Sequence, residues 1–219
     1  MIAAVVFDLD GVILQTEEVW DEVRGRYVVE RGGRYDEAAQ RAMMGMSAPE
    51  WSRFLAEDLG VPGTPEEISA DVVRLMEARY RDELPLIPGA REAVQRLAKR
   101  WPLGLASSSN RPLIDAALDL AGLDRFFTAT VSSEEVPRGK PAPDVYLEAA
   151  RRLGVAPERC AAVEDSHSGI RSAEAAGMRV VAIPNPSFPP DPEALAIADL
   201  ELDSIAGLTV EAIESLAAG

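Results

Sequence analysis

Residues 2–11, Ile2-Ala3-Ala4-Val5-Val6-Phe7-Asp8-Leu9-Asp10-Gly11, decide the fold. The apolar run Ile2–Phe7 has the length of a single strand, and two acids follow it at once. A continuous apolar run with β-branched residues is typical of a strand buried on both faces in a parallel sheet. The carboxyl ends of such strands are where α/β proteins bind their ligands. We therefore expect Asp8 and Asp10 to lie at a functional edge of a parallel sheet.

Similar apolar runs recur along the chain, and amphipathic stretches with helical spacing separate them. In the stretch 90–100, for example, the apolar residues include Ala90, Ala93, Val94 and Leu97. Strand alternating with helix predicts an α/β fold, a Rossmann-like parallel sheet with helices on both faces. The expected strands are Ile2–Phe7, Leu103–Ser107, Thr128–Val131, Ala161–Val163 and Arg179–Ile183, with an edge strand at Ala198–Leu202; the expected helices are Ala90–Arg100, Leu113–Ala121, Val145–Leu153, Ile170–Ala176 and Val210–Leu216.

The interval 15–84 breaks this alternation, because it contains helical patterns and no convincing strand. Thr64-Pro65-Glu66-Glu67 is a helix start, with a capping threonine, proline in the first turn and early acids. We predict a helical cap domain at 15–84, inserted after the first strand, and an α/β core formed by 1–14 and 85–219. The expected cap helices are Val19–Val29, Asp36–Met44, Pro49–Leu59 and Pro65–Arg81.

Composition limits the possible partners of the chain. The 219 residues carry a formal net charge of -15, which disfavours nucleic acid and anionic membranes. No apolar run approaches the ~20 residues of a spanning helix, and no basic segment precedes the first strand, so we expect neither a membrane span nor a signal peptide. The single cysteine, Cys160, is expected to be a small buried hydrophobe. We expect a cytoplasmic protein that is a monomer or a weak homodimer.

Four strand ends or the loops after them carry residues suited to chemistry. Carboxylates gathered from two strand ends would repel each other, and a hard divalent cation such as Mg²⁺ would remove that conflict. A lysine adds positive charge and a serine offers a hydroxyl, so the set matches phosphoryl transfer through an aspartyl-phosphate. The segments are Asp8-Leu9-Asp10-Gly11, Ser107-Ser108-Ser109-Asn110, Lys140 in the loop 138–143, and Glu164-Asp165-Ser166.

Each segment taken alone has an ordinary structural explanation. Acids often end strands as turn formers, serine runs cap helices, and Lys140 alone could be a surface charge. The only histidine, His167, is expected to be a solvated residue in a first helical turn rather than a base. A phospho-accepting receiver domain is a further alternative, but it needs an aspartate at the end of the third strand, and none terminates Thr128–Val131. A binding protein without catalytic activity is not supported, since every expected catalytic group is present in the sequence.

These motifs resemble the haloacid dehalogenase superfamily, in the helical-cap branch that includes β-phosphoglucomutase and phosphoglycolate phosphatase. All four motifs occur in order, and with the helical insertion the resemblance covers most of the chain. The resemblance implies a magnesium-dependent phosphatase of a small phosphorylated metabolite, of phosphosugar or phosphoglycolate type. The matching segments are Phe7-Asp8-Leu9-Asp10-Gly11-Val12, Leu105-Ala106-Ser107-Ser108-Ser109, Gly139-Lys140-Pro141-Ala142-Pro143-Asp144, and Val163-Glu164-Asp165-Ser166 with Gly169-Ile170.

The resemblance also implies a role for each matching residue. Asp8 attacks phosphorus, and Asp10 first protonates the leaving oxygen and then deprotonates water. Ser107 holds the phosphoryl group, and Lys140 neutralises the negative charges of both Asp8 and the phosphate. Mg²⁺ would be held by Asp8, the backbone carbonyl of Asp10 and Asp165, with Glu164 as a ligand or just behind one. Further substrate contacts are expected from Ser108 and Asn110, from backbone N–H groups at Gly11, and from Ser47 and Trp20 of the cap.

Departures from the family pattern favour hydrolysis over a phosphomutase, the alternative reaction. Trp20 stands where β-phosphoglucomutases carry a histidine, and Ala48 follows Gly45-Met46-Ser47 where those enzymes carry a phosphate-binding arginine. A mutase needs a second phosphate-binding site, and the absence of this arginine removes the best candidate residue for that site. Substrate specificity is expected from cap residues that face the site, although each candidate could equally belong to the cap core. The candidates are Trp20, Arg24, Met46, Ser47 and Trp51.

Overall fold

A six-stranded parallel sheet, in the order β3-β2-β1-β4-β5-β6, forms the centre of the larger part of the molecule. The structure is a computed structural model that describes residues 1–43, 46–186 and 189–216. The predicted α/β fold is confirmed, and the ends of all six observed strands lie within two residues of the predicted ones. The strands are β1 Ala4–Phe7, β2 Leu103–Ser107, β3 Phe127–Ser132, β4 Cys160–Glu164, β5 Arg179–Ala182 and β6 Leu200–Glu201.

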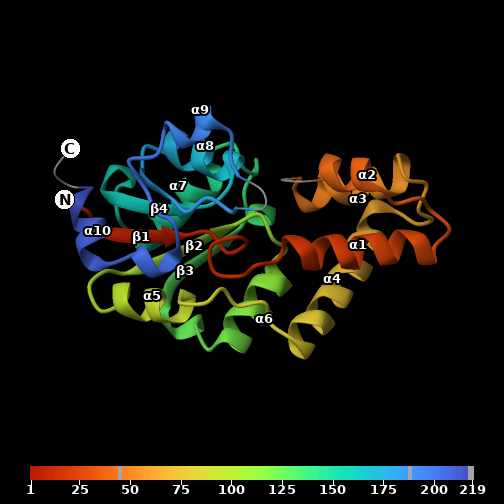
Figure 1. Cartoon of the computed structure of the whole chain (residues 1–219), viewed down its shortest axis with the longest axis horizontal. Helices are drawn as coiled ribbons and strands as arrows, with labels where there is room; N and C mark the ends of the chain where they lie inside the picture. Colours follow the sequence, from red (N-terminus) through yellow and green to blue (C-terminus); the bar gives the residue numbers. More distant parts are fainter. Residues whose placement is uncertain (44–45, 187–188, 217–219) are drawn as a thin grey trace.

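Strand β1 shows why the apolar run had to become a central strand. Its side chains alternate between two hydrophobic cores: Val5 and Phe7 pack into one, and Ala4 and Val6 into the other. Helices cover both faces of the sheet, as Figure 1 shows. On one face lie α5 Ala90–Leu97, α6 Arg111–Ala121 and α10 Val210–Ser215; on the other lie α7 Asp144–Leu153, α8 His167–Ala175 and α9 Pro192–Leu195.

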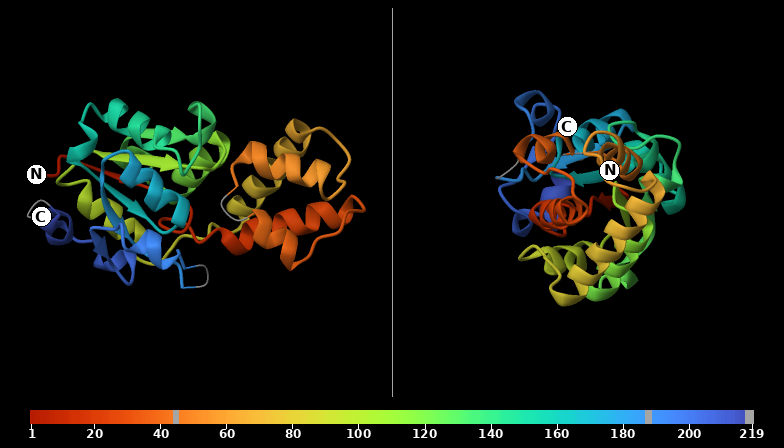
Figure 2. Two further views of the ribbon diagram at one scale, coloured as in Figure 1. Left: turned by 90° about the horizontal axis from the view of Figure 1, so that it is seen from above. Right: turned by 90° about the vertical axis from the view of Figure 1, so that its right-hand side faces the viewer.

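The helical insertion after β1 forms a second body beside the carboxyl ends of the strands (Figures 1 and 2). Its longest helix begins at the predicted start, where Thr64 is the capping residue and forms a capping box with Glu67. The insertion is confirmed, whereas its boundaries at 15–84 stay a prediction; Met44 and Gly45 lie outside the described residues. The helices are α1 Glu17–Glu30, α2 Glu37–Met43, α3 Ala48–Glu57 and α4 Pro65–Asp82.

The two connections between core and insertion run side by side. Leu14 and Leu86 form an antiparallel bridge, the Gln15 N–H donates to the Pro85 carbonyl at 2.8 Å, and the Ile87 N–H donates to the Ile13 carbonyl at 2.9 Å. These bonds fix where the insertion leaves the sheet.

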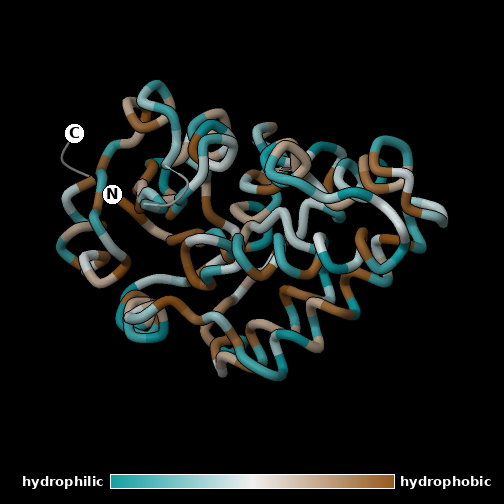
Figure 3. Tube along the Cα trace, turned by 45° about the vertical axis from the view of Figure 1, so that its right-hand side comes forward, coloured by the Kyte–Doolittle hydropathy of each residue, from teal (hydrophilic) through white to brown (hydrophobic). Residues whose placement is uncertain are grey.

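Hydropathy follows the layers of the molecule. In Figure 3 hydrophobic segments run through the interior of the core, and hydrophilic and hydrophobic residues alternate along the helices around it. Within the described parts of the chain, no helix combines the length and the hydrophobicity that a membrane crossing requires.

Candidate active site

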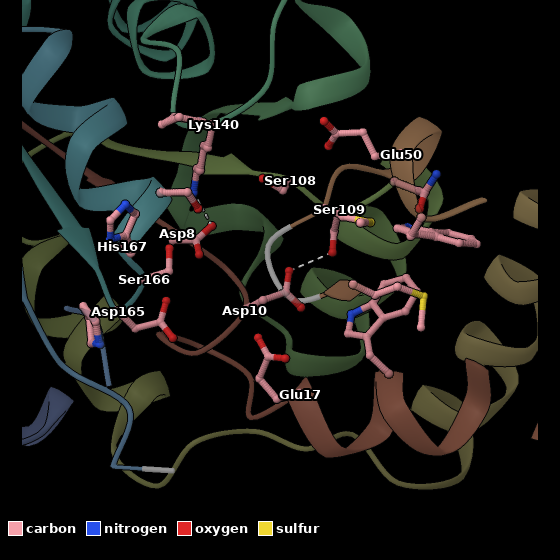
Figure 4. Close-up of a pocket in the computed structure, with 18 of the residues that line it drawn as sticks. Asp8, Asp10, Glu17, Glu50, Ser108, Ser109, Lys140, Asp165, Ser166 and His167 are labelled. Atoms are coloured by element: carbon pink, nitrogen blue, oxygen red, sulfur yellow. Dashed lines mark hydrogen bonds and ion pairs between the residues drawn. The ribbon is translucent and has the colours of Figure 1, made fainter. Parts of the chain in front are cut away.

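The carboxyl ends of β1 and β4 meet beside a buried lysine, as Figure 4 shows in part. Lys140 comes from the loop before α7, and its Nζ donates to Asp8 Oδ1 at 2.8 Å and to Glu164 Oε1 at 2.5 Å. Only 4% of the Lys140 side chain is exposed. Burial alone would lower the pKa of Lys140, but the charges of Asp8 and Glu164 outweigh burial and raise it. Lys140 therefore remains an ammonium against Asp8.

Glu164 is the best-anchored carboxylate of the site. Its Oε1 accepts from Lys140 and from the Tyr146 hydroxyl, the latter at 2.7 Å. Its Oε2 accepts from the N–H groups of Asp165 and Ser166 at 3.1 and 3.3 Å, and from the Ser166 hydroxyl at 3.1 Å. With both oxygens bonded, Glu164 is placed to position Lys140 more than to bind a ligand of its own. Tyr146 was not predicted as a site residue, because it lies inside a helix and in no motif.

Three buried carboxylates at this edge fit a divalent metal. Oxygen atoms of Asp8, Glu164 and Asp165 lie within 4.8 Å of one another. When all three are ionised, the single charge of Lys140 leaves two negative charges unbalanced. Burial raises the pKa of Asp8 to about 8; Lys140 opposes this shift, and the charges of Glu164 and Asp10 add to it. A hard divalent cation such as Mg²⁺ would remove the repulsion.

The absence of a side chain at Gly11 makes room for the Asp165 carboxylate, a candidate ligand of such an ion. No described residue donates a hydrogen bond to the Asp165 carboxylate, although the side chain is buried. Burial raises its pKa first, and repulsion from Glu164 and Asp8 raises it further. Gly11 has a φ of 83°, and a Cβ placed there would lie 1.8 Å from Asp165 Oδ2. The glycine thus provides the space into which an unsatisfied carboxylate points, and this donor set suits Mg²⁺.

The backbone N–H of Gly11, which the sequence suggested as a substrate contact, has a partner within the chain. The Gly11 N–H donates to the Leu14 carbonyl at 2.7 Å, so it is not free to bind a phosphate in this structure. Its contribution to the site is the missing Cβ.

Hydroxyl groups hold Asp10 two residues beyond Asp8. Thr16 donates to Asp10 Oδ1 at 2.5 Å, and Ser109 donates to Oδ2 at 2.7 Å (Figure 4 shows the second bond). Ser107 contributes a longer bond of 3.4 Å to the same Oδ2. The sequence analysis singled out Ser107 but gave no role to Thr16 or Ser109. Ser109 lies in the same serine run, whereas Thr16 reaches Asp10 only because the chain turns back after β1.

The serine run after β2 brings some of its predicted residues to the cavity and buries another. Ser107 is fully buried, and its Oγ accepts from the Ser109 N–H at 3.0 Å. Ser108 and Asn110 line the cavity. The Asn110 side-chain amide donates to Glu134 Oε1 at 2.7 Å, which fixes its orientation.

His167 is half-exposed at the start of α8. Its Nδ1 lies 2.5 Å from Asp191 Oδ2, and its Nε2 accepts from Arg171 Nε at 3.1 Å. The half-exposed side chain lines the cavity, and the expectation that His167 does not act as a base stays a prediction.

Comparison with known proteins identifies the family. A model of the family described as "haloacid dehalogenase-like hydrolase" matches residues 2–177. The chain is a haloacid dehalogenase-like hydrolase.

Relatives of this hydrolase share the insertion as well as the core. Hexitol phosphatase B of Escherichia coli K12 is 31% identical over 214 residues, which cover 96% of each chain. CbbY from Rhodobacter sphaeroides, solved in complex with phosphate, has a TM-score of 0.87 at 29% identity and covers 98% of this chain and 100% of its own. A putative β-phosphoglucomutase from Thermotoga maritima has a TM-score of 0.75 at 29% identity, over 98% and 99% of the two chains. The predicted helical-cap branch is confirmed.

A cavity of about 570 Å³ is lined both by residues at the carboxyl edge of the sheet and by residues of the insertion. Trp20 and Trp51 form part of the cap wall, with their ring centroids 5.9 Å apart. Ser47 is not among the described lining residues; it bonds instead to Glu50 Oε2 at 2.6 Å as the cap of α3. Four of the five cap candidates named from the sequence line the cavity, namely Trp20, Arg24, Met46 and Trp51. Three further residues of the insertion or its start, Glu17, Met43 and Glu50, also line it and were not predicted.

Proposed function

We propose that this hydrolase is a Mg²⁺-dependent phosphatase that acts on a phosphorylated sugar or a similar small metabolite through an aspartyl-phosphate on Asp8. The observation that carries the proposal is the pairing of Asp8 with Lys140 inside a buried acidic cluster, with Asp10 two residues away. A carboxylate nucleophile needs a nearby cation when its target is an anionic phosphoryl group, and a second acid to handle the proton. The site contains both.

In the first step an oxygen of Asp8 forms a bond to phosphorus as the bond from phosphorus to the ester oxygen breaks. Asp10 donates a proton to that leaving oxygen, and Lys140 offsets the negative charge around Asp8. In the second step water attacks phosphorus, Asp10 takes the water proton, and the bond to Asp8 breaks to release phosphate. The hydroxyls of Thr16 and Ser109 hold Asp10 for both transfers.

Mg²⁺ would be held by the carboxylates of Asp8 and Asp165 and by the Asp10 carbonyl, and when bound it supplies positive charge to the transferring phosphoryl group. Glu164, whose oxygens are already hydrogen-bonded, serves mainly to fix Lys140. Of the two roles that the sequence left open for Glu164, a metal ligand or a residue behind one, we therefore propose the second.

Contacts to the phosphoryl group are proposed for the serine run. The proposed contact from Ser107 is its hydroxyl, and Ser108 and Asn110 line the cavity. The helices between residues 15 and 84 act as the cap that closes over the substrate. From the sequence we also retain a cytoplasmic location and a monomer or weak homodimer.

The similarity to a hexitol phosphatase supports a sugar-derived substrate. The test is a screen of sugar, polyol and sugar-acid phosphates with Mg²⁺, in which free phosphate and product are both followed. Release of phosphate that EDTA abolishes and Mg²⁺ restores is the expected result. Isomerisation of a sugar 1-phosphate without phosphate release would favour the phosphomutase alternative, and activity that survives metal removal would refute the metal site.

A further inference from the structure

The cap wall of the cavity contains a buried arginine with no anionic partner. Arg24 lies on α1, lines the cavity and is 8% exposed. Its Nε donates to the Trp20 carbonyl at 3.2 Å, and its guanidinium carbon lies 5.2 Å from the Trp20 ring centroid. The two terminal nitrogens make no hydrogen bond or ion pair with any described residue. Four N–H bonds of Arg24 are therefore left for something else.

The other arginines of this region do not share that condition. Arg26, also on α1, pairs with Glu30 at 2.8 Å and is largely exposed, and Arg31, just after α1, pairs with Asp71 at 3.2 Å. The lysine of the cavity, Lys140, is committed to Asp8 and Glu164. Among the described residues that line the cavity, Arg24 is thus the arginine or lysine whose charge no carboxylate neutralises at contact distance.

Acidic side chains surround Arg24 without pairing with it. Glu17, Asp21 and Asp10 all attract its charge, yet none of their carboxylate oxygens lies within 4.0 Å of its nitrogens. Glu17 lines the same cavity and points toward Asp10 in Figure 4. A buried charge without a direct partner is costly, and the cost is recovered when a ligand brings the opposite charge. The guanidinium fork matches carboxylates and phosphates in a bidentate geometry.

We propose that Arg24 binds an oxyanion at the end of the substrate remote from the reacting phosphoryl group. The preferred substrate is then a small sugar-derived phosphate with a second anionic group, a carboxylate or a second phosphate. Asp8 from the core and Arg24 from the cap line the same cavity, and the carboxylates of Glu17 and Glu50, which also line it, can accept hydrogen bonds from the hydroxyls of a sugar chain. This inference rests on the proposed phosphatase function.

The test compares substrates that differ only at the remote end. For the carboxylate arm, 6-phosphogluconate is compared with glucitol 6-phosphate; for the phosphate arm, fructose 1,6-bisphosphate is compared with fructose 1-phosphate. The wild-type enzyme is expected to prefer the member with the second anionic group, in at least one pair, by roughly 10-fold or more in kcat/KM. Arg24→Gln should lower kcat/KM for that member by about 30-fold, mainly through KM, and should change kcat/KM for the counterpart with an uncharged remote end by less than about threefold.

Two further variants separate recognition from structure. Arg24→Lys keeps the charge but loses the fork, so it should retain part of the preference. Arg26→Gln removes an exposed arginine from the same helix and should leave both arms unchanged. A thermal melt of each variant shows whether the cap remains folded, and Arg24→Lys carries the comparison if Arg24→Gln does not fold.

The pattern across the arms identifies the anion. Preference in one arm alone names a carboxylate or a phosphate, and no preference in either arm overturns the inference, as does an Arg24→Gln enzyme with unchanged selectivity. Binding of the same four compounds, measured by calorimetry with Mg²⁺ present, provides a readout independent of turnover. If no compound is hydrolysed, the phosphatase proposal fails, while equal binding to wild type and Arg24→Gln would overturn the role of Arg24 separately.

Discussion

Replacement of Gly11 by alanine tests the metal site through steric displacement alone. The new Cβ would lie 1.8 Å from Asp165 Oδ2 and 2.3 Å from its Cγ. Normal contacts require roughly 3.5 Å, so the carboxylate must move by about 1.5 Å, out of the position that faces Asp8. Displacement of a metal ligand should weaken Mg²⁺ binding by at least about 10- to 100-fold, the range seen when even outer contacts of a metal site are lost.

Gly32→Ala is a matched control for the backbone. Gly32 has a φ of 82°, against 83° for Gly11, but its Cβ would meet no atom within 4 Å. Both substitutions place a side chain in the left-handed region at a cost of about 1–2 kcal/mol, which corresponds to a fall of about 2–8 °C in Tm. Only Gly11→Ala should also raise the Mg²⁺ concentration for half-maximal activity. The assay titrates Mg²⁺ while following phosphate release and thermal stability.

A Gly11→Ala enzyme with the wild-type Mg²⁺ midpoint would refute the placement of the metal beside Asp165. A Gly32→Ala enzyme with a shifted midpoint would show that the backbone strain, not the displaced carboxylate, is responsible.

Other perturbations address the remaining parts of the site. Asp8→Asn should abolish phosphate release while the chain stays folded by circular dichroism; substantial residual turnover would remove Asp8 as nucleophile. Gly169→Ala would place a Cβ 1.9 Å from the Glu164 carboxylate, so kcat should fall at least about 10-fold, and an unchanged kcat would argue against the anchoring of Lys140 by Glu164. Tyr146→Phe removes one hydrogen bond to Glu164 and should lower the free energy of unfolding by about 1 kcal/mol in denaturant titrations; no change would mean that the bond adds nothing. Burial raises the pKa of Asp8 from 3.8 to about 8. Between pH 3.8 and about pH 8 the folded metal-free chain therefore binds more protons than the unfolded chain. Its free energy of unfolding should fall as the pH rises through this range. Mg²⁺ binds the ionised form, so its stabilising effect on Tm should grow from about pH 5 to about pH 8; a constant effect over that range would contradict this.

The sequence predicted those parts of the molecule that depend on local pattern. Strand β2 was predicted with its observed bounds because Leu103–Ser107 is a continuous apolar run that helical stretches flank. The start of α4 followed from the capping box at Thr64, which needs only neighbouring residues. The convergence of Asp8, Lys140 and Asp165 followed from sheet topology, since parallel strands bring their carboxyl ends to one edge.

Features of the site that depend on tertiary contacts could not be predicted from the sequence. Tyr146 reaches Glu164 from a different element, and no periodicity within α7 shows which buried tyrosine finds an acid. Whether Glu164 binds metal or holds Lys140 depends on donors from several segments. The Gly11 N–H was expected to be free, but the turn after β1 directs it to Leu14. The sequence shows that Ala48 replaces the phosphate-binding arginine of β-phosphoglucomutases. Only the structure shows that another arginine of the cap, Arg24, lines the cavity without a carboxylate partner among the described residues.

The central claim is that Asp8 becomes covalently phosphorylated, and acid quenching tests it most directly. Asp10→Asn lacks the group that activates water, and p-nitrophenyl phosphate has a leaving group that needs no proton, so the intermediate should accumulate in this combination. After proteolysis, mass spectrometry should find one phosphoryl group on the peptide that contains Asp8, and hydroxylamine should remove it, as expected for an acyl phosphate. Phosphate release by the wild-type enzyme with no phosphorylated peptide in the variant, or a phosphoryl group on any other residue, would contradict the account.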